Sequence, residues 1–233
     1  MIERRIANFR VRRYLADSHI LIITIPTRLH EGLHIYLYDI YLDKVKMMGL
    51  RRSWGHIGST TLRSLGHPRG DGGESDSSGG PWPERRFGNS WPTLVIEVGI
   101  SESLGELHRD MQWWFSASQH QVKIVLLAKF DHRQHAILLE RWEEEEPPTR
   151  PGATTTRRAT ALQTLRPVLR QQINITEDAA TSPVSYHVTR GDLVLPFHLL
   201  FLRAPGPQES DIIINIQDLE EYAEIIWDVF RNM

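Results

Sequence analysis

The stretch Trp91–Ser103, WPTLVIEVGISES, decides the fold. It opens with apolar and β-branched residues, a run that is typical of a strand buried inside a sheet. Glu97 ends that run, although an ionised carboxylate is costly to bury without a partner. Ser101 or Ser103 can then cap a helix that has Glu106 in its first turn. The stretch therefore predicts a strand, a turn and a helix, with one acidic side chain to explain.

The composition of the chain limits the classes of protein to which it can belong. The chain has 233 residues, a net charge of −2 and no cysteine. This length suits one large domain with additions. The absence of cysteine excludes a disulfide framework, a thiolate nucleophile and a cysteine-based zinc site, and it fits an intracellular protein, cytoplasmic or nuclear.

We expect no membrane partner, because the apolar run at 20–25 is too short to span a bilayer and no signal peptide is apparent. Any nucleic acid must be met by a local basic patch, since the whole chain is close to neutral. The arginine-rich N-terminal segment, with Arg4, Arg5, Arg10, Arg12 and Arg13, could touch a phosphate backbone. A solvated face is the commoner explanation for such a run, and we expect that here.

Hydrophobic periodicity predicts further elements on both sides of the stretch. The expected strands are 20–25, 93–98, 121–130 and 135–142, with two short β segments within 184–202. The expected helices are one from Thr27 to Gly49, with Glu31 in its first turns, one after Ser103, and one over 218–231. This order predicts a mixed α/β fold.

Two segments are predicted to be irregular. Residues 66–90 are dense in glycine, serine and proline, which favours a loop. Residues 143–158 form a charged, proline-containing excursion, which we expect to be a solvated loop. We therefore expect a single domain over 1–233, with a core at about 20–142 and a C-terminal extension of strands and a helix at 159–233.

A second carboxylate offers a chemical explanation for the presence of Glu97 at the end of a buried strand. Asp76 lies in the predicted loop, 21 residues before Glu97. If the loop crosses the end of the Glu97 strand, the two carboxylates meet at one sheet edge, where like charges repel unless a cation lies between them. A hard divalent ion such as Mg²⁺ or Mn²⁺ is the usual solution, and it can activate water and stabilise charge on a phosphoryl group.

Several segments of the sequence resemble those of one protein family. The span from 21 to 131 is similar to fungal PD-(D/E)XK (restriction-endonuclease-like) proteins, which are related to the bacterial Uma-type proteins. The specific match is WPTLVIEVGISESLGELHRDMQWW at 91–114, supported by IPTRLHE, KMMGL, GST, ESDSS and QVKIVLLAKF at 25–31, 46–50, 58–60, 74–78 and 121–130. The resemblance implies a central mixed sheet flanked by helices, with metal at its edge.

The resemblance also implies roles for individual residues. Asp76 takes the place of the motif Asp and Glu97 that of the motif Glu, so these two would hold Mg²⁺ or Mn²⁺, and Glu31 would assist. The lysine of the pattern falls at Gly99. Gln112 is our first choice to orient the attacking water in its place. The implied activity is metal-dependent hydrolysis of nucleic acid, as an endonuclease or exonuclease.

Two other residues could replace the missing lysine: Arg109, and Lys123 on the neighbouring strand. Each acidic candidate also has a structural explanation. Glu97 could be solvated or paired with arginine, Asp76 could form a turn, and Glu31 could favour a helix N-terminus. Glu102 belongs to the helix cap or adds a ligand.

Aromatic and histidine residues give weaker signals. In the pair Trp113-Trp114, adjacent helical positions point about 100° apart, so one ring is expected in the core and the other at an edge. His30, His34, His132 and His135 are interpreted as structural or exposed residues.

Two other functional hypotheses remain open. The absence of the lysine favours a catalytically inactive relative that keeps the fold as a binding or assembly module. A homodimeric scaffold could instead use exposed Trp82, Trp91 or Trp113 as its interface, and a homo-oligomer is compatible with every one of these hypotheses.

Overall fold

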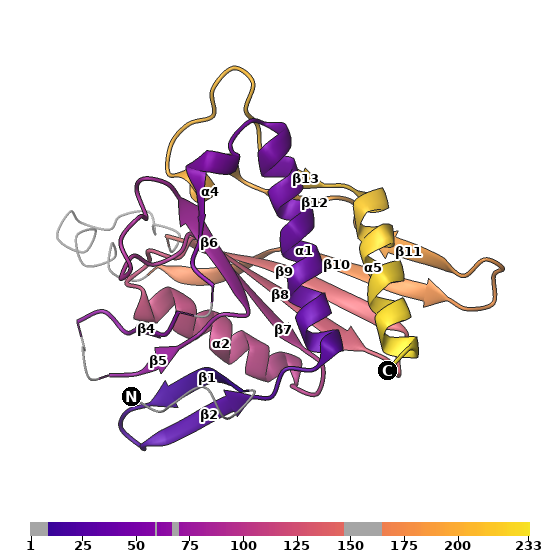
Figure 1. The fold of residues 1–233 in the computed structure, drawn as a ribbon, viewed down its shortest axis with the longest axis horizontal. Coiled ribbons are helices and arrows are strands. Elements are labelled where there is room, and N and C mark those ends of the chain that lie inside the picture. The colour runs from indigo at the N-terminus through magenta and orange to yellow at the C-terminus, as the bar shows by residue number, and fades with distance from the viewer. Residues whose placement is uncertain (1–8, 59, 67–69, 147–164) are drawn as a thin grey trace, which may run out of the picture.

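The computed structural model describes residues 9–58, 60–66, 70–146 and 165–233 (Figure 1). The strands are β1 (Arg10–Leu15), β2 (Ile20–Thr24), β3 (Trp54–His56), β4 (Leu62–Arg63), β5 (Gly72–Gly73), β6 (Ser77–Pro81), β7 (Leu94–Gly99), β8 (Ile124–Asp131), β9 (Ala136–Glu145), β10 (Arg166–Asp178), β11 (Ser185–Thr189), β12 (Leu193–Leu195) and β13 (Ile212–Ile214). The helices are α1 (Arg28–Met47), the short 3₁₀ helix η1 (Arg51–Ser53), α2 (Leu104–Ala117), α4 (Phe197–Phe201) and α5 (Ile216–Arg231).

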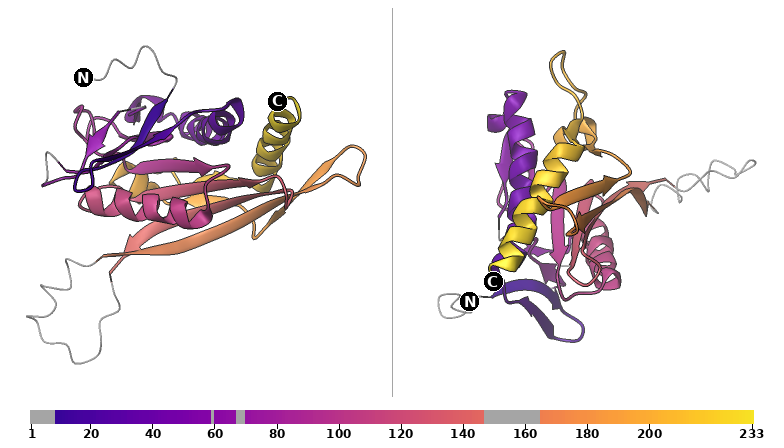
Figure 2. Two further views of the ribbon diagram at one scale, coloured as in Figure 1. Left: turned by 90° about the horizontal axis from the view of Figure 1, so that it is seen from below. Right: turned by 90° about the vertical axis from the view of Figure 1, so that its right-hand side faces the viewer.

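A large mixed sheet organises the molecule. Within the described ranges it has seven strands in the order β11-β10-β9-β8-β7-β6-β3. β7 and β8 are parallel, because α2 connects them as a crossover, and the other neighbours are antiparallel. α1 and α5 cover one face and α2 covers the other (Figure 2). The predicted mixed α/β fold, with a central sheet flanked by helices, is confirmed.

The helix ends follow local sequence signals. Thr27 caps α1 by accepting a hydrogen bond from the His30 backbone, and Gly49 follows the helix with a φ of +75°. Ser103 and Glu106 form a capping box at the start of α2. These caps confirm the predicted starts of both helices, because capping depends only on residues within one turn.

The prediction that residues 66–90 form a loop is wrong in part, because β5 and β6 lie within this range. β6 pairs with β3 and β7 inside the central sheet, and all five of its residues are buried. A side chain at Gly79 would meet Tyr38, Trp54 and the Gly55 carbonyl oxygen, the last at 2.8 Å. Glycine therefore marks a close approach between strands here, not a loop.

The sequence analysis predicts none of β1, β3, β4, β10 and β13, and two of them matter for the architecture. β1 forms a hairpin with β2 in a second sheet, which has the order β2-β1-β5-β4 among the described strands. β10, from the predicted C-terminal extension, pairs along ten residues of β9 and so joins the central sheet. Glu143–Glu145 of the predicted charged loop belong to β9, and residues 147–158 lie outside the described residues.

Candidate functional site

The tertiary structure brings Asp76 and Glu97 to one cavity. Ser77 in β6 pairs with Ile96 in the antiparallel strand β7, so the next facing positions are Asp76 and Glu97. The Asp76 carboxylate accepts a hydrogen bond from the Val98 backbone N–H at 2.9 Å. Both acidic residues line a cavity of about 10 Å³, which we call the Glu97 cavity. One water molecule needs roughly this volume.

Acidic and basic groups surround the Glu97 cavity together. Its remaining lining residues are Arg10, Arg12, Thr24, His30, Glu74, Val98 and Glu102. They come from the β1–β2 hairpin, from α1, and from the segments beside β6 and β7. Four carboxylates and two guanidinium groups therefore meet at one small cavity, and charges at such depth are costly unless each has a partner.

Glu97 is the deepest acidic group of this cavity. It is 4% exposed, and its Oε1 accepts a 2.6 Å hydrogen bond from the indole N–H of Trp114. Burial raises the pKa of Glu97 well above the usual range, and the neighbouring Asp76 and Asp110 raise it further. Nearby Arg13 and the Trp114 hydrogen bond lower this pKa only in part. Glu97 therefore favours either a proton or a cation beside it.

The arginines of β1 make buried ion pairs, so the prediction of a solvated face is wrong for Arg12 and Arg13. Both guanidinium groups hold Asp110 of α2, at 2.6 Å from Arg12 and 2.8 Å from Arg13. Arg12 also reaches Glu102 at 3.3 Å. Arg13 stacks on Trp113, with its guanidinium carbon 3.6 Å from the ring centroid. These ion pairs and the stacking contact hold the β1–β2 hairpin against α2.

Arg10 occupies the other side of the site. It donates to Glu31 at 2.7 Å and to the backbone oxygen of Asp76 at 3.3 Å, and it lies 3.9 Å from the Asp76 carboxylate. Glu31 therefore lies near Asp76, as the resemblance implies, but a guanidinium group partly compensates both acids. Arginine pairing, which we expected only as an alternative for Glu97, is thus found at Glu31 and, more loosely, at Asp76. Glu31 also lies in the first turn of α1, as its structural explanation predicts.

Gly99, where the family pattern has lysine, has little room for a side chain. A Cβ there would lie 3.0 Å from Leu107 Cδ1, which packs α2 against β7. Gln112 is exposed and lines a different pocket, beside Trp113 and His120, so the structure does not bring it to Glu97. Arg109 lines that same pocket.

Lys123 also lies away from the Glu97 cavity, and it donates to the His120 carbonyl oxygen at 2.6 Å. Arg12 and Arg10 supply the positive charge at this cavity instead. Sequence spacing missed these two arginines because they come from a hairpin outside the central sheet.

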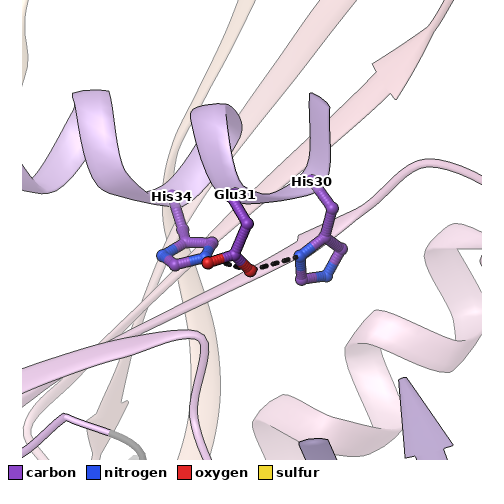
Figure 3. A group of neighbouring side chains, drawn as sticks. All are labelled: His30, Glu31 and His34. Atoms are coloured by element: carbon purple, nitrogen blue, oxygen red, sulfur yellow. Dashed lines mark hydrogen bonds and ion pairs between the residues drawn. The ribbon is translucent and has the colours of Figure 1, made fainter. Parts of the chain in front are cut away.

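His30, Glu31 and His34 form a cluster on the first turns of α1 (Figure 3). Their ligand atoms lie within 4.8 Å of one another, and both histidines are buried. Burial lowers the pKa of His34, although Asp76 and Glu31 oppose this shift. The histidines are therefore buried, as a structural role implies, but they are also grouped. The sequence HEGLH held a signal for this, because it matches the zinc-binding pattern H-E-x-x-H on a helix.

The tryptophans occupy different environments. Trp114 is fully buried while Trp113 is only partly buried, which confirms the expectation of one core ring and one edge ring. Trp91 is 2% exposed and lies in the α2-side core, so its predicted role at an exposed interface is wrong. Trp82 is half exposed.

Comparison with known proteins leaves the function to be argued from this geometry. No protein-family model matches the chain, and no curated protein matches it. Among the described residues, no helix is both long and apolar enough to cross a membrane.

Proposed function

We propose that the protein is a Mg²⁺- or Mn²⁺-dependent phosphodiesterase of the restriction-endonuclease-like class, acting on nucleic acid. One observation carries the proposal: Asp76, which directly precedes β6, and Glu97 in the neighbouring strand β7 line a single cavity. Glu102 lines the same cavity and adds carboxylate oxygens, which are the ligands that hard divalent cations prefer. Glu74 also lines it, but its carboxylate accepts hydrogen bonds from Thr61 and from the Val11 N–H.

The residues present fit a divalent cation. The buried Glu97 carboxylate faces further acidic groups, and the neighbouring Arg13 only partly offsets the rise in its pKa. Asp76 and Glu97 would hold the ion, which when bound would supply an activated water and a counter-charge for the phosphate. Trp114 fixes one oxygen of Glu97, and the Val98 N–H fixes one oxygen of Asp76, so both carboxylates are held in place by the fold.

Arg12 takes the electrostatic role of the absent lysine in this proposal. It lines the cavity beside Glu97 and is oriented by Asp110, which accepts two of its N–H groups at 2.9 and 2.6 Å. A guanidinium group binds phosphate oxygens well because its N–H groups match their geometry. Glu31 assists by holding Arg10 next to Asp76.

Cleavage assays test this proposal directly. Purified protein is incubated with plasmid and with single-stranded DNA and RNA, with Mg²⁺, with Mn²⁺ or with a chelator. We expect metal-dependent cleavage that Glu97→Gln and Asp76→Asn reduce by at least about 10²-fold, because each removes a charge that holds the ion. Glu224→Gln, at an exposed position on α5, is the matched control and should cleave like wild type.

Gln112→Ala adds a second control, because Gln112 lies in a different pocket and its loss should leave cleavage unchanged. Wild-type protein that cleaves none of these substrates, or Glu97→Gln that cleaves like wild type, would contradict the nuclease proposal.

A second candidate function is a catalytically inactive nuclease-fold module for binding or assembly, as a homodimer. Two observations favour it. Arginines already pair with Glu31, Glu102 and Asp110, and no side chain can enter at Gly99 without moving Leu107. In addition, β2 lies at the edge of its sheet and exposes Ile20–Ile23, which is a common way for a strand to pair with another chain.

Two measurements separate the candidates. Calorimetric titration with Mn²⁺ should give saturable heat for a nuclease and none for an inactive module. Native mass spectrometry should show a dimer for the assembly module, and Ile22→Lys on β2 should shift it to monomer while Glu224→Gln should not. A wild-type monomer would contradict the dimer.

A further inference from the structure

We propose that His30, Glu31 and His34 form a second metal centre, beside the Glu97 cavity that His30 also lines, which takes a borderline divalent cation of the Zn²⁺ or Co²⁺ class. Two imidazole nitrogens and one carboxylate oxygen are ligands typical of Zn²⁺ and its neighbours, whereas Mg²⁺ prefers oxygen alone. The inference does not depend on nuclease activity.

The spacing of the three ligand atoms fits such an ion. Glu31 Oε1 lies 3.6 Å from His30 Nδ1 and 3.3 Å from His34 Nε2. Ligand atoms of a tetrahedral zinc site, each about 2.0–2.1 Å from the metal, are roughly 3.3 Å apart. Figure 3 shows the carboxylate placed between the two imidazole rings, facing both. The cluster is thus close to metal-binding geometry before any ion enters.

The far side of each imidazole faces an oxygen, and in His34 this contact is a hydrogen bond. His34 Nδ1 makes a 2.9 Å hydrogen bond with Ser77 Oγ in β6, which leaves Nε2 facing Glu31. His30 Nε2 lies 3.6 Å from the Asp76 carboxylate, which leaves Nδ1 facing Glu31. Metal-binding histidines commonly show this pattern, in which an outer oxygen fixes the ring and its tautomer.

A buried polar atom gives a second and independent indication. His30 is 5% exposed, and its Nδ1 has no hydrogen-bond partner among the described residues. Buried polar groups usually have a partner, and an exception calls for an explanation such as an ion. Coordination of an ion would satisfy this nitrogen without moving the start of α1.

Arg10 competes with the ion in this arrangement. Its guanidinium group donates to Glu31 Oε2 at 2.7 Å and lies 3.5 Å from His34 Nε2. A positive side chain so close to the ligand atoms repels a metal cation. Arg10 therefore sets the affinity of the centre, and an ion that displaces it would also free the Asp76 backbone oxygen to which it donates.

The match to H-E-x-x-H does not make this centre a protease. In that pattern the glutamate is a general base and a substrate must reach the ion. Here Glu31 contacts both histidines, and the cavity that His30 lines has only about 10 Å³. The centre instead joins the start of α1 to β6 beside Asp76, so bound metal should stabilise this part of the fold.

Metal titration of the untagged full-length chain tests the inference. Co²⁺ is added while its visible absorption is recorded, and Zn²⁺ binding is measured by calorimetry. We expect one tight ion per chain, no competition from excess Mg²⁺, and binding weakened at least about 100-fold in His34→Gln and Glu31→Gln. His198→Gln, which removes an exposed histidine on α4, is the matched control and should bind like wild type.

Two further variants make the result decisive. Arg10→Gln should tighten Co²⁺ binding about tenfold or more, a gain that loss of folding could not produce. Glu97→Gln should keep the Co²⁺ spectrum even where it abolishes cleavage, which separates this centre from the nuclease site. Wild type without a stoichiometric Co²⁺ spectrum, or a spectrum that survives both His34→Gln and Glu31→Gln, would overturn the inference.

Discussion

Two buried acidic residues on the same side of the central sheet are treated in opposite ways. Asp110 lies in what we call the Asp110 network, formed with Arg12, Arg13 and Glu102, where two guanidinium groups hold its carboxylate. Glu97 receives a hydrogen bond from the neutral indole of Trp114 and faces other acidic groups. A buried carboxylate that guanidinium groups neutralise has a structural role, whereas a buried carboxylate without such a partner is a place where a cation can bind.

Removing a guanidinium from the Asp110 network should have the largest effect. Arg13 is 4% exposed, and Arg13→Met would leave Asp110 buried with one partner fewer. We expect the free energy of unfolding, measured by urea titration, to fall by about 3–5 kcal/mol. Arg109→Met, at an exposed site on α2, is the control and should change it by less than about 0.5 kcal/mol. Equal effects would show that the network is not structural.

The free energy of unfolding should depend on pH through Glu97, because no guanidinium group among the described residues neutralises its buried carboxylate directly. The pKa of Glu97 is raised in the folded state above the ordinary value of 4.5. Its contribution to stability is therefore complete below about pH 4.5 and is lost as the pH rises toward the folded pKa.

Relative to Glu97→Gln, wild type without divalent metal should lose unfolding free energy as the pH rises from 5 to 7, by at most about 1.4 kcal/mol per pH unit. Thermal and urea unfolding at several pH values measure this difference, and Glu224→Gln controls for the loss of one carboxylate. Added Mn²⁺ should restore the stability of wild type only. If the difference in unfolding free energy between wild type and Glu97→Gln does not vary with pH, the charge of Glu97 is compensated in the fold as that of Asp110 is.

The hydrogen bond that Trp114 gives to Glu97 should have the smallest effect of the three. Trp114→Phe removes the donor, and relative to the same change at Trp227 it should lower the free energy of unfolding by only about 1 kcal/mol. Trp227→Phe is the matched control, because Trp227 is equally buried and its indole N–H has no hydrogen-bond partner among the described residues. Urea titration of both variants should show Trp114→Phe as the more damaging, and equal losses would contradict the role of this bond.

Local signals made much of the fold predictable. The strand around Glu97 and the capped start of α2 were predicted correctly, because apolar runs and capping boxes act within a few residues. β6 was not, since its glycines fit a loop equally well until Tyr38 and Trp54 are known to lie against them. The sequence does not predict β1, because the arginines of RVRRYL indicate a packed strand only when their acidic partners are known.

The candidate site divides in the same way. Asp76 and Glu97 could be named from spacing and resemblance, and the structure places them at one cavity. Position along α2 favours Gln112 as the residue that orients water, but its side chain lies in another pocket. Arg10 and the histidine cluster came from no spacing argument that we made, although HEGLH held a pattern that would have indicated the cluster.

The sequence by itself determined where α1, α2 and the strand around Glu97 lie and which acidic residues deserve attention, because helix caps and hydrophobic periodicity are short-range. Only the tertiary structure decided the charge around each acid. The partners of Asp110, Glu31 and Glu97 come from distant parts of the chain, and their pairing depends on how the β1–β2 hairpin lies against α1 and α2. Electrostatic energy depends on distance in space and on burial, and neither can be read from position along the chain.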